Sequence, residues 1–283
     1  MMSFSLQFVL VLIGTFMIAL VLTPLVRLFS FKIDAVDYPN ARRINTKPMP
    51  SAGGLAIVIA FSIATLVFIP MLTSTTAPIK SYLSYTLPIV GAGWIIALTG
   101  LIDDVKELSA KKKMIGILLA ASLVWFLTDF RLNDFKIPFG GPLLHFEPWL
   151  SYLLTVIWIV AITNAVNLID GLDGLVSGVS IISLVTMGIV SYFFLPVPNL
   201  FLTMTIFVLV ASIAGFFPFN YHPAILYLGD TGALFIGFMI SVLSLQGLKN
   251  ATAVAVVTPM IILGVPITDT FLAIIRRTLS GQK

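Results

Sequence analysis

The carboxylates of this chain are concentrated in a few short polar segments between long apolar runs. The sequence has 283 residues, of which 59% are hydrophobic and only 12 are Asp or Glu. Three acidic motifs stand out: IDDVKE (102–107), NLIDGLDG (167–174) and YLGDTG (227–232). Carboxylate and amide oxygens are the ligands that hard divalent cations prefer, and such cations commonly bind phosphate groups. The motifs therefore indicate a site for a divalent cation and a phosphate-bearing substrate.

The spacing of the motifs predicts that they meet on one side of a membrane. Asp103 and Asp170 are 67 residues apart, and Asp170 and Asp230 are 60 apart. Each interval holds about two membrane crossings of roughly 20 residues plus loops. Because two crossings return the chain to the side it left, we expect all three motifs at the same face.

The first two motifs combine acids with basic or amide side chains. The adjacent carboxylates of Asp103 and Asp104 repel one another, so the pair favours a bound cation or one raised pKa. Lys113 follows within three helical turns and could contact phosphate. Asn167, Asp170 and Asp173 are spaced i, i+3, so they share one face if the helix continues through them. A row of such residues at a membrane boundary is costly unless it has a function.

The third motif has two interpretations. Asp230 precedes an apolar run, so it could be a metal ligand or simply the N-cap of the following helix. Asn220 and Tyr227 lie just before it and offer a polar contact and an aromatic face to a base. A basic loop over residues 37–54 adds three further candidates for phosphate binding. These are Arg42, Arg43 and Lys47.

The composition is that of a polytopic membrane protein. The mean hydropathy is +1.08 and charged residues make up 10%, against about 25% in soluble domains. With no cysteines, disulfides and thiolate chemistry are excluded. The basic pI is interpreted as a topology signal, and we expect no nucleic acid partner. We expect one membrane domain over residues 1–283, an all-α bundle.

The apolar runs predict about nine transmembrane spans, and the Lys and Arg residues predict their orientation. The spans are expected near 5–29, 52–72, 84–102, 114–128, 149–166, 175–195, 200–218, 232–247 and 251–272. An outer N-terminus and inner C-terminus place most basic residues in the cytoplasm. The inner loops are then near 31–51, 103–113, 167–174, 219–231 and 276–283. The outer segment 129–148 contains turn residues and could form a small hairpin.

Together, the motifs DYPNARRINTKPMPSAGG, GLIDDVKELSAKKK, NAVNLIDGLDG, FNYHPAILYLGDTG and PITDTFLAIIRR resemble those of the polyprenyl-phosphate N-acetylhexosamine-1-phosphate transferases. The resemblance covers nearly the whole chain. It is nearest to the branch that uses UDP-N-acetylglucosamine (UDP-GlcNAc), including the enzyme that starts teichoic acid linkage units. It implies a bacterial plasma-membrane enzyme whose partners are a UDP-sugar and undecaprenyl phosphate within membrane lipid, with a homodimer as one assembly.

The resemblance also implies roles for the candidate residues. Asp230 and Asn167 match ligands of Mg²⁺, for which Mn²⁺ is an alternative. Asp103 and Asp104 match a catalytic pair that activates or positions the lipid phosphate. The remaining matches are to substrate-binding residues: Lys113 on the pyrophosphate, and Asp170, Asp173, Asn220 and Tyr227 around the uridine. The family continues past the equivalent of Gln282 into a histidine-containing loop and further helices, so we expect this chain to be C-terminally truncated.

The expected reaction is transfer of N-acetylglucosamine 1-phosphate from UDP-GlcNAc to undecaprenyl phosphate, with release of UMP, as a first membrane step of a cell-wall polymer. Two alternatives remain. One is the MurNAc-pentapeptide phosphotransferase of the same family. The other is an ion-coupled transporter, whose acids would lie at mid-membrane on broken helices.

Overall fold

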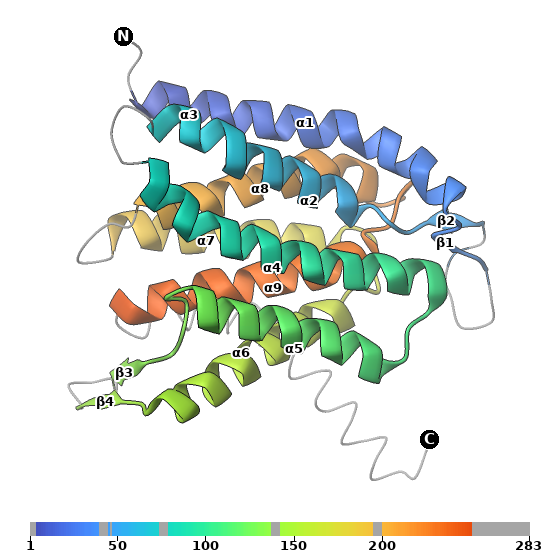
Figure 1. Cartoon of the computed structure of the whole chain (residues 1–283). Helices are drawn as coiled ribbons and strands as arrows, with labels where there is room; N and C mark the ends of the chain where they lie inside the picture. Colours follow the sequence, from blue (N-terminus) through green and yellow to red (C-terminus); the bar gives the residue numbers. More distant parts are fainter. Residues whose placement is uncertain are drawn as a thin grey trace.

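A computed structural model of the chain describes residues 4–39, 45, 47–73, 79–136, 142–194 and 200–250. Nearly all of its regular structure is helical (Figure 1). The helices are α1 (Phe4–Lys32), α2 (Gly54–Ile63), α3 (Ile69–Thr73), α4 (Ile79–Lys106), α5 (Ala110–Leu127), α6 (Pro148–Leu168), α7 (Leu175–Phe193), α8 (Leu200–Asn220) and α9 (Gly229–Asn250). A π-helical segment η1 (Ala64–Phe68) joins α2 to α3. Two small antiparallel pairs complete the structure: β1 (Val36–Asp37) with β2 (Met49–Pro50), and β3 (Asp134–Lys136) with β4 (Leu143–His145).

Helix α9 occupies the centre of the bundle. It packs mainly against α4 and α6, with α2 also in contact, whereas α1 lies at the periphery against α8 and α2 (Figure 1). In the most apolar 18-residue stretch of each helix, 83% of the residues are buried in α9 and 22% in α1. The apolar side chains of α1 therefore face outward, as expected of a helix bordered by lipid.

Small residues let the neighbours of α9 come close to it. A Cβ atom on Gly54 of α2 would overlap the backbone of Gly232, and one on Gly100 of α4 would overlap the backbone of Asp230. One on Gly237 would approach Thr163 of α6 at 3.0 Å. Membrane helices gain little from the hydrophobic effect between themselves, so close backbone packing at small residues is a main source of their association.

The structure confirms an all-α membrane fold. Seven of the described helices are long and apolar enough to cross a membrane: α1, the α2–α3 rod, α4, α6, α7, α8 and α9. The predicted span 114–128 is present as α5, but three of the 18 residues of this helix are lysines, and it is not among the seven. The predicted ninth span, 251–272, lies outside the described residues, as does the inner segment 276–283.

The predicted inner segment 103–113 is shorter than expected, because the helices on both sides of it run past their apolar residues. Helix α4 continues to Lys106 and α5 begins at Ala110, so residues 103–113 are mostly helical rather than a loop. The hairpin predicted within residues 129–148 is confirmed as β3–β4, in which Asp134 pairs with His145. This hairpin lies at the opposite end of the bundle from the β1–β2 pair (Figure 1).

The contact between Gly54 and Gly232 predicts an asymmetry between two glycine substitutions. Gly54→Ala should lower the thermal unfolding temperature, because overpacking a close contact typically costs about 1–3 kcal/mol. Gly91→Ala on α4 is the matched control, since a Cβ there meets no atom within 4 Å. Thermal unfolding of the detergent-solubilised protein measures both, and equal unfolding temperatures would contradict the packing described.

Candidate active site

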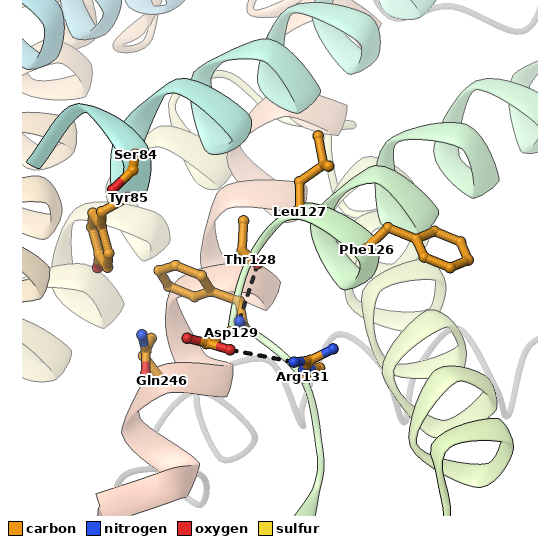
Figure 2. A pocket seen from close by; sticks show the side chains of 9 residues that line it. Ser84, Tyr85, Phe126, Leu127, Thr128, Asp129, Arg131 and Gln246 are labelled. Atoms are coloured by element: carbon orange, nitrogen blue, oxygen red, sulfur yellow. Dashed lines mark hydrogen bonds and ion pairs between the residues drawn. The ribbon is translucent and has the colours of Figure 1, made fainter. Parts of the chain in front are cut away.

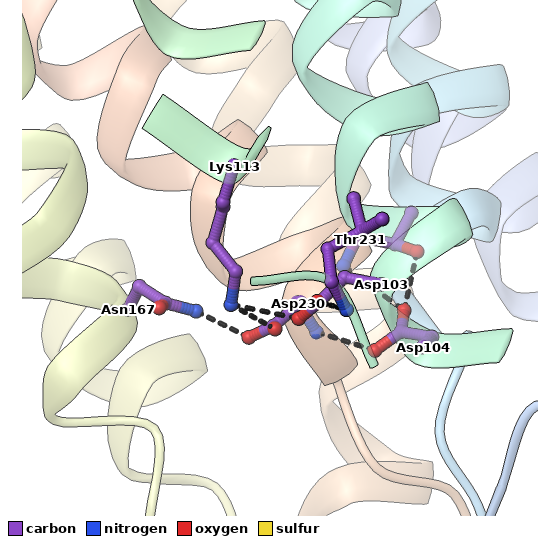
Figure 3. A network of polar contacts seen from close by, with 7 residues as sticks. Asp103, Asp104, Lys113, Asn167, Asp230 and Thr231 are labelled. Atoms are coloured by element: carbon purple, nitrogen blue, oxygen red, sulfur yellow. Dashed lines mark hydrogen bonds and ion pairs between the residues drawn. The ribbon is translucent and has the colours of Figure 1, made fainter. Parts of the chain in front are cut away.

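The polar side chains of the three acidic motifs meet at one end of the bundle (Figure 3). Helices α4 and α6 end here, and α5 and α9 begin here. These four helices contribute Asp103, Asp104, Lys113, Asn167 and Asp230. The structure therefore confirms that the three motifs lie at the same end of the bundle, where side chains from each of them are in contact.

At the centre of the cluster, two carboxylates share one ammonium group. Lys113 Nζ lies 2.7 Å from Asp103 Oδ2 and 2.6 Å from Asp230 Oδ2. The Lys113 side chain is only 18% exposed, that of Asp103 9% and that of Asp230 26%. Partial burial weakens solvent screening, so these ion pairs are stronger than pairs on an open surface.

Asn167 holds the other oxygen of Asp230. Its Nδ2 atom donates a hydrogen bond of 2.5 Å to Asp230 Oδ1. Asp230 therefore has a lysine on one oxygen and an amide on the other, and its carboxylate plane is fixed from two helices.

Asp104 faces away from this ion pair and binds the first turn of α9. Its Oδ1 accepts from the Asp230 backbone N–H at 2.8 Å, and its Oδ2 accepts from the Thr231 N–H at 3.0 Å and from Thr231 Oγ1 at 2.5 Å. The first N–H groups of a helix have no partner within the helix and carry partial positive charge. The cap of α9 is thus Asp104 of another helix, and the interpretation of Asp230 as the cap is wrong.

Glycines permit the close approach of Asp104 and Ser51 to the start of α9. Gly229 has φ of +71°, a conformation that other residues rarely adopt, and a Cβ on it would overlap the Ser51 carbonyl oxygen. The amide of Gly54 donates to the Leu228 carbonyl at 2.8 Å, which fixes the chain just before α9 against the start of α2.

Asp103 also closes the turn between α4 and α5. Its Oδ1 accepts from the Leu108 N–H at 2.5 Å, and Glu107 in the same turn has a positive φ of 46°. This tight turn brings the first turn of α5, with Lys113, back onto the end of α4.

A second polar group fixes the segment between α8 and α9. Asp173 Oδ2 accepts from the Ala224 N–H at 3.0 Å and lies 2.9 Å from His222 Nδ1. From α1, Arg27 Nε donates to the Ile225 carbonyl at 3.2 Å. Asp173 thus contacts protein groups of this segment, in addition to any contact that it makes with substrate.

Asn220 is only 4% exposed, and both ends of its amide are engaged. Its Oδ1 accepts from Ser177 Oγ at 2.9 Å, and its Nδ2 donates to the Leu226 carbonyl at 3.3 Å. These contacts tie α7, α8 and the start of the following segment together.

The other predicted substrate residues lie around this end or outside the described part of the chain. Burial, together with the charges of Asp230 and Asp37, raises the pKa of Asp170 to about 7. Tyr227 is held through its backbone, donating to the Pro50 carbonyl at 2.9 Å and accepting from the Gly53 N–H at 3.0 Å. Lys47 is exposed, and Arg42 and Arg43 lie outside the described residues.

A separate cavity of about 400 Å³ lies at the other end of α5 (Figure 2). It is lined by Ser84, Tyr85, Phe126, Leu127, Thr128, Asp129, Phe130, Arg131 and Gln246. None of the predicted site residues lines it, so the acidic cluster rather than this cavity is the candidate active site.

The sequence analysis assigned no role to Thr231, His222 or Ser177. Each is placed by a contact with a residue 43 to 127 positions away. Thr231 directly follows Asp230, which was the one local signal that could have suggested it.

The chain is similar to known proteins over most of its length. The model of glycosyl transferase family 4 matches residues 86–248. A Bacillus subtilis (strain 168) protein described as a probable undecaprenyl-phosphate N-acetylglucosaminyl 1-phosphate transferase is 42% identical over 278 residues, covering 98% of this chain and 73% of that protein.

Two further relatives have related descriptions. The decaprenyl-phosphate N-acetylglucosaminephosphotransferase of Mycolicibacterium smegmatis is 32% identical, over 91% of this chain and 67% of that protein. The phospho-N-acetylmuramoyl-pentapeptide-transferase of Staphylococcus saprophyticus is 33% identical, over 84% and 74%. The chain belongs to glycosyl transferase family 4.

The cap on α9 predicts the effect of removing one hydroxyl. Thr231→Val should destabilise the protein by about 1.5–3 kcal/mol, the usual contribution of a hydrogen bond to a charged group, and should slow the reaction by displacing Asp230. Thr231→Ser should retain most of both properties. Ser241→Ala, which removes a buried hydroxyl bonded to the Phe238 carbonyl on the same helix, is the control for stability and activity. An effect of Thr231→Val no larger than that of Ser241→Ala would contradict the role given to this bond.

Proposed function

We propose that this protein transfers N-acetylglucosamine 1-phosphate from UDP-GlcNAc to undecaprenyl phosphate and releases UMP. The observation that carries the proposal is the meeting of Asp103, Lys113, Asn167 and Asp230 from four helices at one end of a membrane bundle. Acidic, amide and basic groups side by side suit a reaction between two phosphate-bearing substrates at a membrane surface.

The donor is proposed from the relatives. The Bacillus subtilis and Mycolicibacterium smegmatis proteins are both described as N-acetylglucosamine phosphate transferases, and the former matches 98% of this chain. Because the Staphylococcus saprophyticus relative is described as a phospho-N-acetylmuramoyl-pentapeptide-transferase, UDP-MurNAc-pentapeptide remains the alternative donor. An ion-coupled transporter is disfavoured, because the acids lie at helix ends rather than at mid-membrane.

The residues of the cluster fit a hard divalent cation. Asp103 and Asp230 each place a carboxylate oxygen next to the ammonium nitrogen of Lys113, and Asn167 contacts Asp230. The proposed ligands are the Asp230 carboxylate and the Asn167 amide oxygen, since hard divalent cations prefer oxygen ligands. Within the described residues no group of three or more His, Cys, Asp or Glu side chains is arranged for a metal. Mg²⁺, or Mn²⁺ in its place, would supply charge neutralisation at the pyrophosphate when bound.

The proposed chemistry exchanges one phosphoanhydride for another. An oxygen of undecaprenyl phosphate forms a bond to the β-phosphorus of UDP-GlcNAc, and the bond from that phosphorus to the UMP oxygen breaks. The second pKa of a phosphate monoester is about 6, so the attacking group is mostly ionised near neutral pH and needs no strong base. Lys113 would contact the donor phosphates, and Asp103 would orient the attacking phosphate together with the cation.

We assign Asp104 a positioning role rather than a place at the reacting atoms. Both of its oxygens accept hydrogen bonds from the first turn of α9, which carries Asp230. Asp173 and Asn220 would act similarly on the segment before α9, with Asp170 and Tyr227 nearest to a uridine. Arg42, Arg43 and Lys47 remain predicted phosphate contacts, and a homodimer also stays a prediction.

The reaction can be tested with two donors. Radiolabelled UDP-GlcNAc and undecaprenyl phosphate should give a lipid-linked product and UMP, whereas UDP-MurNAc-pentapeptide should not. Asp230→Asn should lower the rate by at least about 100-fold, the scale seen when one charge-stabilising group is removed. Asp129→Asn, the same change at a 78% exposed residue at the other end of the bundle, is the control. Preferential use of the pentapeptide donor would move the protein to the alternative activity.

We also propose that the acidic cluster faces the cytoplasm of a bacterial plasma membrane, on the strength of the Lys and Arg distribution. The chain has no cysteine, so single cysteines give labelling without background. In intact cells, an impermeant thiol reagent should label His145→Cys in the outer hairpin and leave Lys112→Cys and Tyr221→Cys unlabelled. The reverse pattern would contradict the proposed orientation.

A further inference from the structure

The position between Asp103 and Asp230 is already taken by a cation that belongs to the protein. Lys113 Nζ lies within 2.7 Å of one oxygen from each carboxylate, and this pair of oxygens is also the most direct donor pair for a divalent ion. An ion bound at the 2.0–2.1 Å that Mg²⁺ requires could not share both oxygens with the ammonium group. The positive charges of the two would also repel one another at such a distance.

Each of the two carboxylates has one further hydrogen bond that does not involve Lys113. Asp103 keeps its hydrogen bond from the Leu108 N–H, and Asp230 keeps its bond from Asn167. After departure of the lysine, these bonds would hold both acids near the vacated position, and the repulsion between the two carboxylates would favour a new cation there. Lys113 is 18% exposed and lies in the first turn of α5, on a flexible four-carbon side chain.

A nucleotide diphosphate offers the lysine an alternative partner. Its phosphate oxygens carry negative charge and form short charge-assisted hydrogen bonds with ammonium groups. Transfer of Lys113 from the carboxylates to the diphosphate would free the carboxylates for the divalent ion. The ion would then meet both the protein oxygens and the diphosphate.

We infer that Lys113 acts as an internal counter-ion that occupies the cation position in the nucleotide-free protein and is drawn off by the diphosphate of the donor. This inference rests on the proposed function. Its consequence is that divalent cation and nucleotide bind cooperatively, since the nucleotide removes the competitor of the ion. By linkage, the ion strengthens nucleotide binding by the same factor.

The test is Mn²⁺ binding to the detergent-solubilised full chain, followed through the electron paramagnetic resonance signal of free Mn²⁺. Without nucleotide, Lys113→Gln should bind Mn²⁺ about tenfold or more tightly than the wild type, within the usual range of coupling between sites. Lys112→Gln removes the same charge from an exposed neighbour and should bind like the wild type. UDP should tighten Mn²⁺ binding at least about tenfold in the wild type and much less in Lys113→Gln, after correction for the Mn–UDP complex in a protein-free titration.

The outcomes separate this inference from the proposed function. Unchanged or weaker Mn²⁺ binding by Lys113→Gln, or an equal gain in Lys112→Gln, overturns the competition but leaves the metal in place. Absence of Mn²⁺ binding in every variant, with and without UDP, overturns the proposed metal as well. If Lys113→Gln does not fold, the wild type alone decides, because a Mn²⁺ affinity that UDP does not raise is incompatible with a displaced lysine.

Discussion

The hydrogen bonds from the first turn of α9 to Asp104 hold the metal-ligand candidate in place, and much of the site depends on them. Three donors from two adjacent residues converge on one carboxylate. The attraction is electrostatic, between a negative side chain and the positive end of a helix, in a partly buried position where it is strong. Since Asp230 is one of the two residues held, its own carboxylate is fixed relative to α4. The ion pair with Lys113 and the contact with Asn167 follow from that placement.

The convergence of the three motifs could be predicted from spacing, because crossings of a membrane come in whole numbers. The different contacts that Asp103 and Asp104 make could not be predicted from the sequence. Successive residues of a helix point about 100° apart, so one of the pair faces Lys113 and the other faces α9. No pattern in the sequence shows which helix lies on either side.

The contacts of the segment before α9 could not be predicted from the sequence either. Asp173 and Asn220 stand out in the sequence because polar residues at a membrane boundary usually bind something. In the structure they bind the protein itself, through the Ala224 amide and the Leu226 carbonyl. Backbone groups of irregular segments carry no sequence signature, so contacts with them cannot be anticipated. The extent of α4 and α5 was underestimated for a related reason, since their charged ends remain helical beyond the apolar residues.

The central place of α9 has a consequence for biogenesis. The chain is made from its N-terminus, so α1 to α8 are synthesised before the helix that they surround. Until α9 is inserted, the glycine-bearing surfaces of α2 and α4 lack the helix that they pack against. Asp104 likewise lacks the backbone amide that it caps, which lies 126 residues later in the chain. The earlier helices must therefore either leave a gap or assemble around α9 once it is inserted. In both cases the acidic cluster is completed only by the arrival of α9. A nascent chain that lacks this helix therefore holds the acids of α4 without the opposing carboxylate, and the site cannot form before residues 229–250 are made.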